Sequence, residues 1–302
     1  MLLVKDIIKE LGCLTFAGNP DTLINDVIQL SAENQRDDVI FWCSNKNSDV
    51  LNSISHGTII CSNIALDKTI HPQCNLIIVD NPRYYFSKLI EKFFYAPPLR
   101  NTVSKTAVIH ATASIGQNCF IGNHVVIEEN CIIGDNCHIG HNTVIHYGTI
   151  INNNVKIGCN NTIGGFGYGY EKNITGQYEP LPHIGNVVIE NDVEICNNSC
   201  IDRAALGSTL IKKNAKISNL VHIGHGTIIG ENSLIIANAM IAGSVIIGDN
   251  VWVAPSASVI NKITIGNGAI VGLSAVVIRP VKENTVVAGN PARKLKKKEI
   301  SS

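Results

Sequence analysis

An aliphatic residue at every sixth position is the feature that most limits what this chain can fold into. An α-helix repeats about every 3.6 residues and a half-buried strand alternates, so neither explains a strict period of six. The period instead predicts a parallel β-helix of hexapeptide repeats, in which six residues form a short strand and a turn, and three such sides close one coil. The repeat positions are Ile109, Ile115, Ile121, Ile127, Ile133, Ile139, Ile145, Ile151, Ile157 and Ile163, then Ile189, Ile195 and Ile201, then Ile211, Ile217, Ile223, Ile229, Ile235, Ile241, Ile247, Val253, Val259, Ile265, Val271 and Val277.

Glycine and asparagine recur near the corners that such a coil requires, as at Gly116, Asn118, Asn130, Gly134 and Asn136. Both residue types tolerate the left-handed backbone conformation of a tight corner. Cysteines stand four places after a repeat isoleucine, where a small side chain fits, so we interpret Cys119, Cys131 and Cys137 as structural. None of the ten cysteines forms a CxxC pair, which favours a reducing, cytoplasmic location.

Residues 1–98 do not follow the period. Helical patterns ("VKDIIKEL", "YYFSKLIEKFF") alternate there with short β-like runs ("DVIFW", "GTIICS", "NLIIVD"), which predicts a separate α/β domain. The repeats define a solenoid over residues 99–286, and residues 287–302 are expected to form a short basic tail.

Composition excludes several classes of protein. The net charge is zero, so nothing indicates a nucleic-acid partner. No uncharged apolar run approaches the roughly 20 residues that span a bilayer, so no membrane span is predicted. The first residues, "MLLVKDIIKELG", carry Lys5, Lys9 and Glu10 within the apolar pattern, which predicts an amphipathic helix rather than a secretory signal.

Two segments interrupt the period. The shorter, "DRAALGST" at residues 202–209, lengthens one corner. The longer, "GGFGYGYEKNITGQYEPLPHIG" at residues 164–185, is rich in glycine and aromatic residues. A long loop ejected from a regular scaffold commonly serves a binding edge, so Phe166 and Tyr168 are candidate substrate-binding residues, although a plain surface insertion remains the alternative.

The segment "NLVHIGHGTIIGENSLIIANAMIAGS" contains a candidate catalytic pair. His225 follows Ile223 by two places and Gly243 follows Ile241 by two, so the two residues are expected one coil apart on the same side. An imidazole can remove a proton from an attacking nucleophile, and a backbone N–H can stabilise an oxyanion. Together they suit acyl transfer from a thioester to an amine or hydroxyl; the alternative is a pair of ordinary surface positions. His222 is a further candidate for binding substrate.

No metal site is predicted. His222 and His225 lack a third ligand, and the early-coil histidines, His138, His141 and His146, occupy expected corner or surface positions. A metal-dependent hydratase would need three histidines converging across a subunit boundary. Triangular solenoids usually pack side by side, so a homotrimer is expected.

Several segments resemble the UDP-3-O-acylglucosamine N-acyltransferases of lipid A biosynthesis. They are "GGFGYGYE", "IDRAALGST", "NLVHIGHGT" and "IAGS" in the solenoid, and "LINDVIQLSAENQRDDVIFWCSN" before the repeats. The resemblance implies a trimeric left-handed parallel β-helix preceded by a small α/β nucleotide-binding domain. It also implies transfer of a 3-hydroxyacyl chain from acyl carrier protein to the 2-amine of a UDP-linked 3-O-acylglucosamine, with no tightly bound cofactor.

The resemblance also assigns residues. The motif histidine matches His225 as general base, and the glycine of "AGS" matches Gly243 as oxyanion donor. The aromatic residue that stacks on uracil matches Trp42, with Asn45 as a nearby polar contact. A core position in the strand "VIFW" is the alternative for Trp42.

The chain departs from the family pattern at several points. Ser218 stands where an aspartate usually precedes "NLV" in the family, and "AALGS" replaces "GALDD". A histidine that often follows "SVIN" is absent, and this chain has Lys262 there. The end, "VVAGNPARKL", is similar to coenzyme A-dependent hexapeptide acetyltransferases of amino sugars. These departures leave open an acyl- or acetyl-coenzyme A donor and another nucleotide-linked amino sugar, destined for O-antigen or another surface glycan. Lys296, Lys297 and Lys298 are candidates to contact the coenzyme's phosphates or the carrier protein, with a solvated tail as the alternative.

Overall fold

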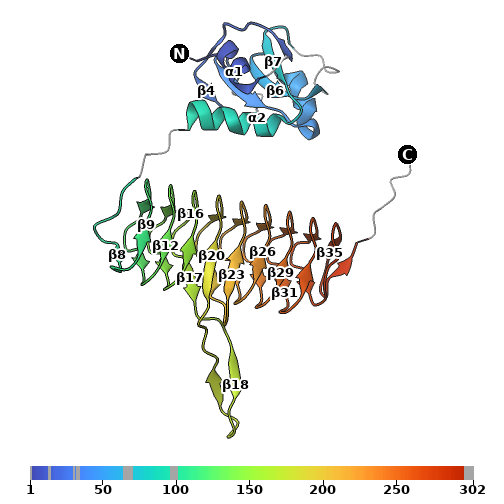
Figure 1. Ribbon diagram of the computed structural model, residues 1–302. Helices are drawn as coiled ribbons and strands as arrows, with labels where there is room; N and C mark the ends of the chain where they lie inside the picture. The colour runs from blue at the N-terminus through green and yellow to red at the C-terminus, as the bar shows by residue number, and fades with distance from the viewer. Residues whose placement is uncertain are drawn as a thin grey trace. The chain divides into compact units, whose positions relative to one another are not determined.

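The chain forms two compact units, residues 1–99 and 100–302. In this computed structural model the described residues are 2–12, 15–29, 31, 35–63, 71–95 and 101–295, except for the side chains of residues 45–48 (Figure 1). The first unit mixes helices with a small sheet, and the second is a solenoid of short strands.

The first unit is built on a five-stranded sheet. Strands β4 to β7 run parallel, and β2 joins the edge of the sheet antiparallel to β7. The sheet order is β2 (Thr15–Ala17), β7 (Cys74–Ile78), β6 (Gly57–Cys61), β5 (Val39–Trp42) and β4 (Asp26–Val27). The remaining elements are β1 (Leu2–Leu3) paired with β3 (Leu23–Ile24), the helices α1 (Val4–Leu11) and α2 (Pro82–Leu89), the 3-10 helix η1 (Asn45–Ser53) and the π-helical turn η3 (Ile90–Phe94).

Local sequence explains the helix ends in this unit. Helix α1 stops at Gly12, whose left-handed backbone (φ 63°) suits glycine. Helix α2 begins with Pro82 in its first turn, and the Asn81 side chain accepts a hydrogen bond from the Tyr84 N–H. All five residues of β6 and of β7 are buried, as expected for parallel strands covered on both faces.

The second unit is a parallel β-helix with three sheets, as the six-residue period predicts. The first sheet holds β10 (Phe120–Ile121), β13 (His138–Ile139), β16 (Lys156–Ile157), β21 (Glu194–Ile195), β24 (Lys216–Ile217), β27 (Leu234–Ile235), β30 (Trp252–Val253), β33 (Ile270–Val271), β35 (Val286–Ala288) and β36 (Arg293–Lys294). The second holds β8 (Val108–Ile109), β11 (Val126–Ile127), β14 (Val144–Ile145), β17 (Thr162–Gly165), β22 (Cys200–Asp202), β25 (His222–Ile223), β28 (Met240–Ile241), β31 (Ser258–Val259) and β34 (Val276–Val277). The third holds β9 (Ser114–Ile115), β12 (Ile132–Ile133), β15 (Ile150–Ile151), β20 (Asn186–Ile189), β23 (Ser208–Ile211), β26 (Ile228–Ile229), β29 (Ile246–Ile247) and β32 (Thr264–Ile265).

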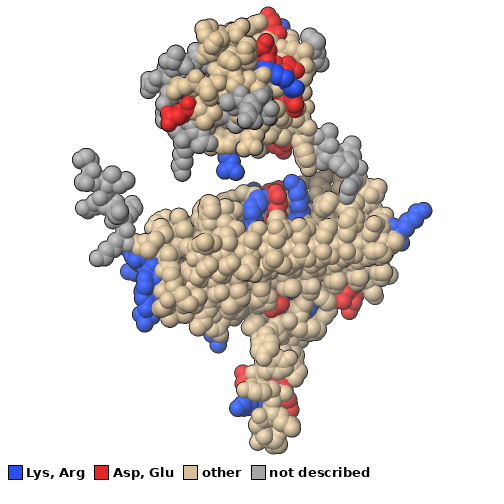
Figure 2. Space-filling view, turned by 180° about the vertical axis from the view of Figure 1, so that it is seen from behind, with Lys and Arg blue, Asp and Glu red and all other residues tan. Residues whose placement is uncertain are grey.

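Most of these strands have two residues, one pointing outward and the repeat aliphatic pointing inward. Charged side chains are sparse over the solenoid face seen in Figure 2. On the first sheet, Lys156 and Lys216 lie on either side of Glu194, with nitrogen–oxygen distances of 3.6 and 3.0 Å. On the third sheet the outward residues are mostly aliphatic.

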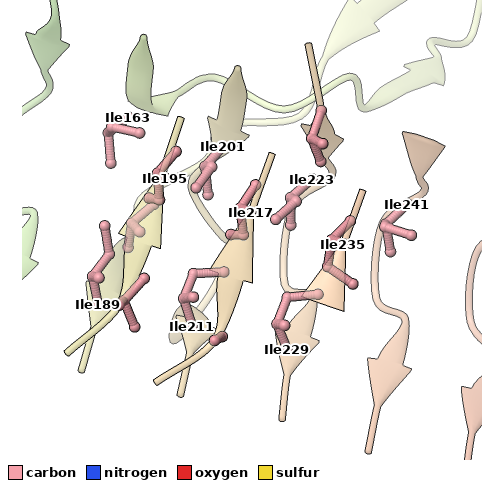
Figure 3. Close-up of a cluster of buried hydrophobic side chains, with 14 of the residues drawn as sticks. Ile163, Ile189, Ile195, Ile201, Ile211, Ile217, Ile223, Ile229, Ile235 and Ile241 are labelled. Atoms are coloured by element: carbon pink, nitrogen blue, oxygen red, sulfur yellow. The ribbon is translucent and has the colours of Figure 1, made fainter. Parts of the chain in front are cut away.

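The inward aliphatic side chains form the core of the solenoid (Figure 3). Ile201 pairs in parallel register with Ile163 on one side and Ile223 on the other, and Ile223 pairs with Ile241. All four are 0% exposed. Burying one such side chain is worth about 1.5–3 kcal/mol, so the column stabilises each coil against the next.

The corners adopt the left-handed conformation at one residue in nearly every repeat, most often asparagine. The asparagines also bond to each other from coil to coil: Asn118 donates to Asn136, and Asn136 donates to Asn154, both at 3.3 Å. Leu220 breaks this pattern. It has a φ of 60° and stands in the column between Asn198 and Asn238.

Residues 164–185 leave the solenoid as an arm (Figure 1). Its outer part is an antiparallel hairpin of β18 (Tyr170–Lys172) and β19 (Tyr178–Pro180).

The solenoid continues farther than the sequence pattern suggests. The boundary expected after residue 286 falls inside β35, because Val287 is buried and pairs with Val271, and β36 then folds back on β35. Lys296, Lys297 and Lys298 lie outside the described residues.

Replacing Leu220 by asparagine should stabilise the solenoid. A left-handed backbone costs an ordinary residue roughly 1–2 kcal/mol, and asparagine tolerates it better. We expect the free energy of unfolding to rise by about 0.5–1 kcal/mol, measured as a higher thermal midpoint. The reverse change one coil away, Asn198→Leu, should lower the midpoint. A Leu220→Asn protein that melts no higher than the wild type would contradict the strain at this corner.

Candidate active site

The structure brings His225 and Gly243 together at one corner of the solenoid. His225 lies just after β25, and Gly243 lies just after β28 on the next coil. A Cβ placed on Gly243 would lie 2.6 Å from Cε1 and 2.7 Å from Nε2 of His225. The imidazole therefore rests against the Gly243 backbone, in space that any other residue would fill.

The N–H of Gly243 is a free donor among the described residues. At several other corners, the N–H two places after the repeat aliphatic donates to a side chain of the next coil. Examples are Asp135 to Asn153 Oδ1 at 2.8 Å, Cys159 to Asn197 Oδ1 at 2.7 Å and Glu231 to Asp249 Oδ1 at 2.8 Å. The part of the chain that the structure describes offers no such acceptor to Gly243. A backbone donor beside an imidazole is suited to an oxyanion.

The arm covers the other side of His225. His183, near the end of the arm, packs edge to face on His225 with ring centroids 5.1 Å apart and an interplanar angle of 78°. A Cβ placed on Gly167 would lie 2.8 Å from His183 Nε2 and 2.9 Å from His225 Nδ1. Sequence reasoning did not single out His183, which is 2% exposed.

Arg203 fixes both ends of the arm. Its fully buried guanidinium donates to the carbonyls of Gly164 at 2.7 Å, Gly185 at 3.3 Å and Tyr147 at 2.7 Å. Its Cζ also lies 3.5 Å from the centroid of the Tyr147 ring, a cation–π contact. The segment 202–209 thus supplies the residue that closes the arm at its base.

A carboxylate, that of Asp202, lies beside His222, although Ser218 stands where the family resemblance leads one to expect an aspartate. Asp202 Oδ2 is 3.5 Å from His222 Nε2, and Asp202 is 9% exposed. Burial raises the pKa of the Asp202 carboxyl, and the neighbouring His222 and His183 oppose that shift. The half-buried His222 therefore faces Asp202 on the second sheet, next to the corner that carries His225.

Tyr168 and Phe166 have different surroundings. Tyr168 lines a cavity of about 690 Å³ together with His225, Asn261 and Lys262. Phe166 lies instead at the base of the arm, with its ring centroid 6.5 Å from that of Tyr147. The predicted loop thus contributes Tyr168 to the cavity beside His225, whereas Phe166 is not among the residues lining it.

The surroundings of His225 favour its neutral form. Burial lowers the pKa of the imidazole, and His183, His222 and Lys262 lower it further by repelling positive charge. A neutral imidazole is the form that accepts a proton.

The first unit presents a pocket of its own around Trp42. This half-buried side chain packs against a core cluster and also lines a pocket of about 370 Å³, together with Val27, Gln29, Phe86 and Ile90. Trp42 thus belongs to the core and is also accessible from this pocket, while its stacking on uracil stays a prediction. Asn45 opens η1, and its side chain lies outside the described part of the chain.

Metal-binding residues do not gather in this structure. Across the described ranges, no three His, Cys, Asp or Glu side chains lie close enough together to hold a metal ion. Within the same ranges, no helix has the length and apolarity to cross a bilayer.

A hexapeptide solenoid with an imidazole and a free backbone N–H at one corner defines a hexapeptide-repeat acyltransferase. Comparison with known proteins agrees: residues 112–147 and 130–165 match the family model described as bacterial transferase hexapeptide (six repeats). The chain belongs, more narrowly, to the UDP-3-O-acylglucosamine N-acyltransferase family. It is 43% identical over 228 residues to the member from Campylobacter lari, covering 70% of this chain and 71% of that one.

Other relatives support the same family. A UDP-3-O-acylglucosamine N-acyltransferase of Koribacter versatilis is 41% identical over 253 residues, covering 77% of this chain and 73% of that one. Among solved structures, the UDP-N-acetylglucosamine acyltransferase of Francisella novicida superposes with a TM-score of 0.59 at 25% identity. That similarity covers 64% of this chain and 68% of the other.

Alanine at Gly243 should displace the imidazole of His225. The Gly243 backbone is not left-handed, so the new Cβ disturbs mainly the ring that it meets. We expect the rate of acyl transfer to fall by roughly a hundredfold, as for a misplaced catalytic group, and the thermal midpoint to fall slightly.

A double variant separates the contact from other effects. When His225 is already alanine, the Gly243→Ala change should no longer lower the thermal midpoint. An equal drop in both backgrounds would show that Gly243 acts independently of the ring.

Proposed function

We propose that the protein transfers a 3-hydroxyacyl chain from a phosphopantetheine thioester to the 2-amine of a UDP-linked 3-O-acylglucosamine. The contact between His225 and Gly243 carries this proposal, because an imidazole beside an unbonded backbone N–H is suited to the roles of base and oxyanion donor. The names of the relatives supply the acceptor.

The reaction follows from these two groups. The amine of the sugar attacks the thioester carbonyl while neutral His225 accepts a proton from the nitrogen. The carbonyl oxygen becomes an oxyanion, which the Gly243 N–H stabilises by roughly 3 kcal/mol. The tetrahedral intermediate then expels the thiolate, and protonated His225 returns its proton to the sulfur. The products are an amide and a free thiol.

The cavity beside His225 has the composition of a sugar-phosphate site. Lys262 supplies a positive charge, and Tyr168, Tyr170 and Tyr178 supply aromatic faces and hydroxyl groups. The uracil ring would stack on Trp42 in the pocket of the first unit. Asn45 and His222 are proposed as further polar contacts to the substrate.

A homotrimer is part of the proposal. The outward positions of the third sheet are mainly aliphatic over successive coils: Ile132, Ile150, Val188, Leu210, Ile228 and Ile246. Ile132 and Ile246 are 49% and 47% exposed in the single chain. An apolar ladder on a flat face favours burial against another copy.

The free cysteines among the described residues fit a reducing, cytoplasmic location.

The donor is either an acyl carrier protein or acyl-coenzyme A. Arg279, Lys282, Arg293 and Lys294 line a pocket of about 290 Å³ at the last coil, which favours an anionic group. Both donors carry phosphates. The sequence "GNPAR" brings Ala292 and Arg293 into this pocket, so coenzyme A transfer to another amino sugar is the second candidate function.

A transfer assay tests the proposal directly. UDP-3-O-acylglucosamine is supplied with 3-hydroxyacyl-carrier protein or with acyl-coenzyme A, and the amide product is measured by mass spectrometry. We expect product with the carrier protein, and a loss of roughly 10²–10⁴-fold in turnover for His225→Gln.

The assay also has a pH dependence. Because the pKa of His225 lies below the ordinary value of 6.5, the acidic limb of kcat/KM should fall below that pH. Full turnover by His225→Gln would remove His225 as the base. Acylation of a different nucleotide-linked amino sugar by acyl-coenzyme A alone would establish the second candidate.

Trp42→Ala should weaken binding of UDP, because stacking on a base contributes about 1–3 kcal/mol. Calorimetry with UDP should show a loss of roughly tenfold or more, whereas Trp42→Phe should keep most of the affinity. Tyr84→Ala is the control, since Tyr84 is 54% exposed and does not line the Trp42 pocket. Unchanged UDP affinity in a folded Trp42→Ala protein would mean that Trp42 is only a core residue.

A further inference from the structure

We propose that His183 is a positioning residue for His225: its ring forms a wall on the arm side that holds the base against Gly243 and excludes water from it. The inference rests on the proposed role of His225 as general base. It assigns a function to the arm that neither the repeat pattern nor the arm's aromatic residues indicate.

His225 lies between two glycines. Gly243 meets it from the next coil, and Gly167 meets it from the arm, each within a distance that would exclude a Cβ. His183 completes the arm side, with its ring nearly perpendicular to that of His225. The imidazole of His225 is therefore confined by contacts from two different elements, which limits its rotation.

One hydrogen bond fixes the orientation of the His183 ring. Its Nδ1 lies 2.7 Å from the carbonyl oxygen of Leu181, and a carbonyl only accepts, so Nδ1 carries the proton. The other nitrogen, Nε2, is buried and has no hydrogen-bond partner among the described protein groups. His183 is therefore held at Nδ1 by the backbone of the arm, and its unbonded Nε2 edge lies where a Cβ on Gly167 would meet it.

Substrate does not reach His183, because the residue is 2% exposed and is absent from the lining of the cavity. Its effect must pass through His225. Arg203 holds the arm at Gly164 and Gly185, just outside Gly167 and His183, so the wall is anchored to the solenoid on both sides.

Several charged or titratable groups surround His225. His183 faces it from the arm, His222 from β25 and Lys262 from the corner after β31. Asp202 lies next to His222, and Glu171 of the arm lines the same cavity as His225. Removing the His183 wall would let water reach the imidazolium form of His225. Because water favours the charged form, the pKa of His225 should then rise.

Two variants separate the ring from its hydrogen bond. His183→Phe keeps an aromatic wall and loses the donor to Leu181. His183→Asn offers a donor near Nδ1 and loses the outer edge of the ring. Ile174→Ala, at the fully exposed tip of the arm (105% exposed), is the control for general effects on the arm.

The first readout does not depend on activity. The free enzyme is treated with diethyl pyrocarbonate over a range of pH. Of the two protonation states of histidine, this reagent modifies only the neutral imidazole. Mass spectrometry then follows modification at His225, with His222 in the same peptide as an internal reference. We expect the midpoint for His225 to move to higher pH in His183→Asn and to stay near the wild-type value in His183→Phe and Ile174→Ala.

The second readout is the pH profile of kcat/KM. His183→Asn should lose roughly tenfold or more in kcat with a smaller change in KM, because the base is displaced while substrate binding is kept. An unmoved midpoint for His225 in a folded His183→Asn protein would overturn the inference. If the His225 midpoint shifts in His183→Asn but the wild-type enzyme transfers no acyl group in the assay, the inference stands and the proposed function is refuted.

Discussion

The stacking of one aliphatic side chain per six residues is the interaction on which the rest of the solenoid depends. Ile201, Ile223 and Ile241 lie over one another in parallel register, so each coil repeats the path of the coil below it. A residue's place on the surface is then set by its distance from the repeat aliphatic. His225 and Gly243 both follow such a residue by two places, and their contact is a consequence of the core.

The same regularity shows which contacts this corner lacks. At several other corners a side chain of the next coil accepts a hydrogen bond from the N–H of the corner residue, as Asp249 accepts from Glu231. Above His225 the next coil offers only Gly243, which leaves room for the imidazole. Asn261, one coil further, lines the cavity and does not bond to the Gly243 N–H. The proposed pairing of base and oxyanion donor therefore depends on Gly243, whose missing side chain leaves the imidazole its place.

The sequence alone predicts only the part of the site that the six-residue period positions. The parallel solenoid and the pairing of His225 with Gly243 follow from counting residues. His183 and Arg203 do not, because the arm separates Ile163 from Ile201 by many more residues than one coil contains, and counting cannot place a residue across that insertion. The available signals were an arginine two places after a repeat isoleucine and a histidine directly after a proline. Neither shows by itself that one closes the arm and the other contacts the base.

Arg203 shows why the arm is held by a charge. A buried guanidinium without a carboxylate partner loses hydration, and packed apolar residues often stabilise a fold better. Here three carbonyl oxygens and the Tyr147 ring satisfy it, and two of those carbonyls belong to Gly164 and Gly185 at the ends of the arm. An apolar side chain would fill the space without fixing either strand. We interpret the charge as the source of directional bonds that set where His183 meets His225, so that the environment of the base depends on an anchor at the foot of the arm.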